Sequence, residues 1–145
     1  DLSVSEINTA GVPNHRMKTL IIDIKFNEDH FERTIHHEIF HIIKDGHGTF
    51  FNELIWEKYN NGEFKYAECS TCSNRLGLSI YKNTNGFLTE YSMSTANEDM
   101  AEVFSFLMID TNNVKNKAKE DYILNKKISF IKKNILKIDN KFNFK

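Results

Sequence analysis

Residues 30–45 read HFERTIHHEIFHIIKD. Four apolar side chains recur there at the three- and four-residue steps of one helical face, namely Phe31, Ile35, Ile39 and Ile42. Asp29 stands three positions before Glu32, as in an N-terminal capping box, and Gly46 follows the last periodic residue. The pattern predicts an α-helix over residues 30–45 that buries its isoleucine face.

His37 and His41 lie four residues apart on this predicted helix, and Glu38 directly follows His37. Residues at this spacing share one helical face, so the two imidazoles can bind one tetrahedral Zn²⁺. Glu38 lies about 100° further round the helix axis, where its carboxylate can reach a water on the metal. The three residues form the H-E-x-x-H arrangement of metallopeptidases. His36 is out of register with the pair, and we expect it beside the site at most.

A catalytic zinc needs a third protein ligand and one open position. Glu98 is the first candidate, in a helix that the sequence predicts over residues 97–110. Glu102 follows four positions later on the same face. One carboxylate can then bind the metal while the other accepts a proton from a ligating imidazole. In the alternative, Glu98 only completes a capping box with Thr95.

His47 is the second candidate, because it follows His37 by ten residues, as does the third histidine of metzincins. That motif places a glycine where this chain has Lys44. A residue with a Cβ is disfavoured in the sharp turn required there. We therefore favour Glu98 as the third ligand and place His47 at the substrate rim, with a metzincin-like protease as the alternative.

The sequence HEIFH at residues 37–41, followed by Y-x(6)-E-x(3)-E at residues 91–102, resembles the catalytic domain of anthrax lethal factor and the bacterial Pro-Pro endopeptidases. The stretch GFLTEYSMSTANEDMAEVF, residues 86–104, is similar to a segment of the zinc-binding metallopeptidases of gut bacteria. The resemblance covers roughly residues 31–108. It implies a zincin-like fold of the gluzincin type, cleavage of peptide bonds, and a secreted, toxin-like bacterial enzyme.

The resemblance also implies the role of each site residue. His37, His41 and Glu98 would bind Zn²⁺. Glu38 would be the general base, and Tyr91 would stabilise the oxyanion. Glu102, one helical turn after Glu98, would hydrogen-bond to a ligating histidine and fix the orientation of its ring. A binding module of the same fold that has lost its activity is the rival interpretation.

The rest of the chain supports an α+β fold. The alternation in residues 18–26 predicts a strand of a small mixed sheet that packs on the active-site helix. We expect a short helix over residues 50–59, then loops with one or two short strands over residues 63–91. Residues 112–118 read as a polar connector before a final amphipathic helix over residues 121–138.

The chain of 145 residues is long enough for one catalytic domain, residues 1–145. Within it we expect an extended lead-in over residues 1–17 and a C-terminal helix and tail over residues 118–145. A net charge of −1 offers no field that would recruit nucleic acid. No apolar run approaches the length of a membrane span. We expect a monomer that acts on a peptide or protein substrate.

Three secondary features have a plain interpretation. Cys69 and Cys72 read as free thiols, with a local disulfide or a metal site as alternatives. Trp56 reads as a core residue. Five lysines of the final helix read as a solvated face opposite its apolar stripe, namely Lys126, Lys127, Lys132, Lys133 and Lys137.

Overall fold

The computed structural model describes residues 11–22, 30–80 and 84–144. Over these ranges the chain is α+β, with five α-helices and one sheet of two strands. Strand β1 (Gly11–Asn14) pairs antiparallel with β2 (Thr19–Ile22), and Gly11 stands opposite Ile22. The expected small sheet is therefore present, but it is antiparallel rather than mixed in the described part of the chain.

The hairpin adds a strand that the sequence pattern does not predict. β1 lies inside the stretch 1–17, expected to be an extended lead-in, and a four-residue strand containing Pro13 shows no clear alternation that would predict it. In β2, Leu20 and Ile22 are half-buried whereas Ile21 is exposed, as the alternation predicts. The remainder of the predicted strand, residues 23–26, and the cap residue Asp29 lie outside the described residues.

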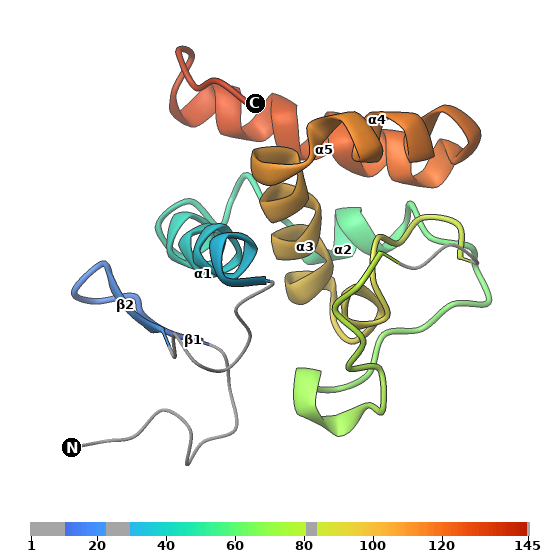
Figure 1. The fold of residues 1–145 in the computed structure, drawn as a ribbon, viewed down its shortest axis with the longest axis horizontal. Helices are drawn as coiled ribbons and strands as arrows, with labels where there is room; N and C mark the ends of the chain where they lie inside the picture. Colours follow the sequence, from blue (N-terminus) through green and yellow to red (C-terminus); the bar gives the residue numbers. More distant parts are fainter. Residues whose placement is uncertain (1–10, 23–29, 81–83, 145) are drawn as a thin grey trace.

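Helix α1 (Phe31–Gly46) packs against α3 (Ala96–Ile109), and the β1–β2 hairpin contacts α1 (Figure 1). The bounds of α1 agree with the sequence, but its buried face does not. The isoleucines are only partly buried. The deeply buried side chains are Arg33, Thr34, His37, Glu38, Phe40 and His41. This polar face can turn inward because α3 supplies carboxylates that pair with it.

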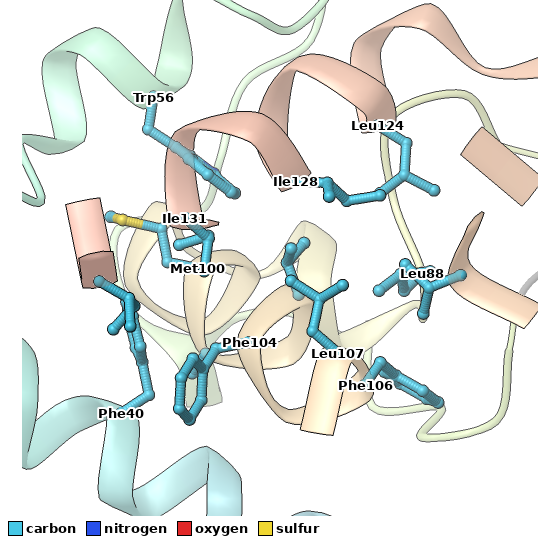
Figure 2. Packing of buried hydrophobic residues seen from close by; sticks show 14 of the residues in the cluster. Phe40, Trp56, Leu88, Met100, Phe104, Phe106, Leu107, Leu124, Ile128 and Ile131 are labelled. Carbon is cyan, nitrogen blue, oxygen red and sulfur yellow. The ribbon is translucent and has the colours of Figure 1, made fainter. Parts of the chain in front are cut away.

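Helix α3 is enclosed on most sides and lies between α1 and α5 (Tyr122–Ile138) (Figure 1). Figure 2 shows its Met100, Phe104 and Leu107 side chains within the buried cluster. Each of these is at most 1% exposed. Burying a large apolar side chain contributes about 1.5–3 kcal/mol. The core therefore anchors the helix that carries Glu98.

Two elements differ from the sequence reading. Residues expected to form a polar connector belong to helix α4 (Thr111–Glu120). Val114 and Ala118, four residues apart, are its buried contacts with the core, and two small apolar residues are too weak a signal for a helix. Helix α2 (Glu53–Glu57) is shorter than predicted, because Asn52 caps it at Ile55 N at 3.2 Å.

Residues 63–80 and 84–91 contain no strand. Two short 3₁₀ turns stand there instead, η3 (Ser70–Cys72) and η4 (Tyr91–Met93). Cys69 and Cys72 form a disulfide, so the prediction of free thiols is wrong. Their Cα atoms are 5.1 Å apart, which lies in the usual range for a disulfide.

The final helix and the tryptophan largely follow expectation. The apolar stripe of α5 is buried at Leu124, Ile131 and Ile135, and Trp56 is a core residue. Lys127, predicted to be solvated, is 0% exposed. It points inward because a buried carboxylate, Asp99, pairs with it. Over the described ranges, no helix has the length and apolar character needed to cross a bilayer.

Candidate metal centre

Three side chains from two helices converge at the contact between α1 and α3. The possible ligand atoms of His37, His41 and Glu98 all lie within 4.8 Å of one another. Glu98 Oε2 lies 2.8 Å from His37 Nε2 and 3.4 Å from His41 Nε2. Within the described chain this is the one group of His, Cys, Asp or Glu residues that could hold a metal ion. Two imidazole nitrogens and a carboxylate oxygen form a donor set that suits Zn²⁺.

The protonation of this group reflects its burial and its charges. Burial alone would lower the pKa of His37, but hydrogen bonds to Glu102 and Glu98 outweigh burial and raise it to about 10. Burial would raise the pKa of Glu98, yet hydrogen bonds from His37 and His41 bring it below its usual value. Glu98 therefore carries a negative charge at neutral pH and faces both imidazoles.

The N-terminal cap of α3 is formed by the Thr95 side chain, which leaves the Glu98 carboxylate free to contact the histidines. Thr95 Oγ1 accepts a hydrogen bond from Glu98 N at 3.2 Å, which starts the helix. The Glu98 side chain does not return to cap Thr95 and instead points to the histidines. The backbone amide of Glu98 therefore takes part in the helix cap, while its carboxylate takes part in the candidate metal site.

Glu102 lies one turn after Glu98 and holds the other edge of the His37 ring. His37 Nδ1 donates to Glu102 Oε1 at 2.9 Å, so Nε2 faces Glu98 and His41. The Glu102 carboxylate is 0% exposed and also pairs with Arg33 and accepts from Thr89 Oγ1 at 2.7 Å. Burial would raise the pKa of Glu102, but the hydrogen bond from His37 and the Arg33 charge lower it. Contacts of this kind fix a ring's orientation and tautomer.

Arg33 and Thr89 are absent from the sequence-based site. Arg33 lies four residues before His37 on the same helical face, and this spacing could have placed it at the site. It was missed because the isoleucine face of the helix, not this polar face, was expected to be buried. Thr89 has no such signal, because it lies in an irregular segment thirteen residues before Glu102, the residue to which it donates.

Glu38 lies beside the histidines and lines the same cavity as His41, Glu98 and Tyr91. Its side chain is largely buried, and burial is the main cause of a raised pKa. Gly11 of β1 packs on it: a Cβ on Gly11 would lie 2.8 Å from Glu38 Cγ. The absence of a side chain at position 11 therefore lets the hairpin approach the carboxylate.

Tyr91 begins the 3₁₀ turn η4 and lines the same cavity as Glu38. Its ring centroid lies 5.9 Å from that of His37. Burial and the nearby Glu98 charge raise the pKa of the Tyr91 hydroxyl, so the group keeps its proton at neutral pH. The Tyr91 side chain hydrogen-bonds with Ser70 and Glu98 and lines the cavity, so a neutral phenol is available there as a hydrogen-bond donor.

The cavity has a volume of about 580 Å³, which lies in the range of ligand sites. Residues from distant parts of the sequence line it, including Pro13 and His15 of the hairpin, Lys44 and Gly48 near the end of α1, and Ser70.

His47 does not join the metal group. It follows the last residue of α1, its side chain is exposed, and its ring stacks on Phe50 with centroids 6.3 Å apart. Because α1 continues to Gly46, the chain does not turn back toward the metal group after His41 as the metzincin arrangement would require.

A second buried hydrogen-bond network is centred on Asp99, the residue that follows Glu98. Asp99 Oδ2 accepts from Lys127 Nζ at 2.6 Å, Trp56 Nε1 at 2.8 Å and the Tyr66 hydroxyl at 2.5 Å. Lys127 Nζ also donates to Gly86 O at 2.7 Å. The network ties α5, α2 and the loop before η4 to the first turn of α3. Sequence reasoning missed it because Lys127 lies next to Lys126 in an apparently solvated run.

Comparison with known proteins gives the class of the chain. Residues 8–144 match the model of a family described as "Putative zinc-binding metallo-peptidase". The match covers most of the chain, so the protein belongs to this family of zinc-binding metallopeptidases. Its cofactor is Zn²⁺, and its substrates are peptides or proteins. No curated protein and no solved structure matches the chain.

Proposed function

We propose that the protein is a zinc-dependent endopeptidase of the gluzincin type, in which His37, His41 and Glu98 bind the metal. The observation that carries the proposal is the convergence of the possible ligand atoms of these three residues to within 4.8 Å of one another. His41 and Glu98 line one cavity together with Glu38. A zincin-like fold is supported by the packing of the H-E-x-x-H helix between a strand pair and a second helix that carries the acidic residue.

The chain's own residues supply the remaining chemistry. When bound, zinc polarises the scissile carbonyl and lowers the pKa of water toward about 7. The Glu38 carboxylate takes the proton of the attacking water and passes it to the leaving amine. The Tyr91 hydroxyl donates a hydrogen bond to the oxygen that gains negative charge. Glu102 keeps the His37 ring oriented through Nδ1.

The test compares Glu38→Gln with Glu98→Ala, using peptides blocked at both ends and measuring zinc content alongside cleavage. Glu38→Gln should keep zinc and lose cleavage, because only the base is removed. Glu98→Ala should lose zinc as well. Near-native cleavage by Glu38→Gln would refute the mechanism. A wild-type protein that holds zinc and cleaves no peptide of a broad library would instead be a binding module.

We also propose that the enzyme is exported from a bacterial cell. The Cys69–Cys72 disulfide supports this, because structural disulfides persist in oxidising compartments and are rare in the cytosol. Fractionation of the native host, with thiol labelling of the recovered protein, would test it. Recovery in the cytosol with both thiols reduced would contradict the proposal.

A further inference from the structure

A second cavity, of about 500 Å³, is lined by residues of α5, of the segment that joins α1 to α2, and of α2 and the residues just after it. Its walls combine two kinds of side chain. Three are aromatic and three are cationic: Phe50, Tyr59 and Phe130, and Lys126, Lys133 and Lys137. No acidic residue is among the described residues that line this groove. We call it the lysine groove.

The positive charge of the lysine groove is not neutralised locally. Its three lysines are exposed, and none of them forms an ion pair with another described residue. Lys137 donates to the neutral Asn134 Oδ1 at 2.9 Å, and Lys126 lies over the Tyr122 ring at 4.3 Å. The whole chain carries a net charge of −1, so this is a local concentration of positive charge. Such a surface attracts anionic partners.

The concave shape and the aromatic walls of the groove favour a peptide over a membrane as its anionic partner. A flat anionic surface such as a membrane would meet the lysine heads without filling the cavity. A peptide segment can insert a side chain between Phe50, Tyr59 and Phe130 while its carboxylates meet the lysines at the rim. Aromatic side chains in a concave patch are typical of protein–peptide contacts.

The lysine groove also adjoins the proposed active site. Gly48 lines the cavity of the metal group, and the next residue, Thr49, lines the groove. The two cavities therefore meet at consecutive residues just after the end of α1.

We propose that the lysine groove is an exosite for an acidic segment of the protein substrate, with an aromatic or aliphatic residue among its carboxylates. The assignment of the segment to the substrate rests on the proposed peptidase function. Binding of the segment itself does not, and it can be measured without turnover.

The binding experiment uses the Glu38→Gln variant, which keeps the peptide intact, and a fluorescent octapeptide of glutamates around a central phenylalanine. Replacing Lys126, Lys133 and Lys137 together by Gln should weaken binding at least tenfold. Raising the salt concentration should reduce the difference, because exposed charges are screened. The matched control replaces three exposed lysines outside the groove by Gln, namely Lys115, Lys119 and Lys141.

A second variant separates insertion from simple attraction of charge. Ser129 lines the groove and is exposed, so Ser129→Arg adds positive charge while it fills the space. An inserted peptide should then bind several-fold more weakly. Unchanged or tighter binding to Ser129→Arg would overturn the proposal. So would equal binding by the triple-lysine variant and its control, or binding to phosphatidylserine vesicles without binding to the peptide.

Turnover gives a readout that distinguishes this proposal from the proposed function. For a substrate that carries the acidic segment after the scissile bond, the triple-lysine variant should raise KM at least fivefold and leave kcat unchanged. For the same substrate without the segment, both constants should stay at wild-type values. If the wild-type protein cleaved neither substrate, the result would count against the proposed peptidase function. Absent peptide binding in Glu38→Gln would count against the exosite alone.

Discussion

Replacement of Lys127 by Met should destabilise the fold by several kcal/mol. The Lys127 ammonium and the Asp99 carboxylate are both 0% exposed and lie 2.6 Å apart. Met fills a similar volume, but it leaves the carboxylate without a cation and Gly86 O without its donor. Trp56 and Tyr66 still donate to Asp99 and soften the loss. Removing one partner of a buried ion pair typically costs about 3–5 kcal/mol.

Urea unfolding followed by tryptophan fluorescence measures this cost, with free zinc held constant because a ligand of the folded state shifts its stability. The same loss should lower Tm by about 6–20 °C, at roughly 2–4 °C per kcal/mol for a chain of this size. The double variant Lys127→Met with Asp99→Asn should recover much of the stability, because no charge remains buried. A loss below about 1 kcal/mol in the single variant would refute the view that this pair is essential to the core.

Three further predictions concern the site. Tyr91→Phe should lower kcat by about 10²–10³, as for loss of one oxyanion donor, with zinc content unchanged; an unaltered kcat would remove the proposed role. Gly11→Ala should also lower kcat without releasing zinc, because the new Cβ would lie 2.8 Å from Glu38 Cγ and displace the carboxylate; a Pro13→Ala control should have little effect, and equal losses in both would point to general disruption of the hairpin. Zinc affinity should rise with pH between about 6.5 and 10, because zinc must displace the proton that the zinc-free protein holds on His37, whose pKa is about 10. The same proton stabilises the zinc-free fold below pH 6.5, and this contribution is lost as pH rises through about 10. Chelator-competition titrations at several pH values would check the affinity, and a flat profile would contradict the assignment.

Much of the local structure follows from residue spacing. Because neighbours at i, i+3 and i+4 share a helical face, the sequence predicts α1, α3 and α5 within a few residues of their ends. The same rule pairs His37 with His41 and Glu98 with Glu102 before any coordinates are known. The family match supports the zinc-binding metallopeptidase class. The role of each residue stays a prediction until variants are tested.

Other features depend on contacts between residues far apart in the chain. Periodicity suggests that α1 buries isoleucines, yet its polar face is buried because Glu98 and Glu102 stand opposite. Lys127 is buried for the same kind of reason, since Asp99 compensates its charge. The approach of Gly11 to Glu38 joins residues 27 positions apart and has no local signature.

The sequence by itself determined the three strongly periodic helices, α1, α3 and α5, and which pairs of side chains share a face, because both depend on backbone geometry over a few residues. It did not determine α4, whose buried face is only a few residues. Only the tertiary structure decided which faces meet. Burying a polar or charged group is unfavourable alone and tolerated when a partner is present, and that partner comes from another part of the chain.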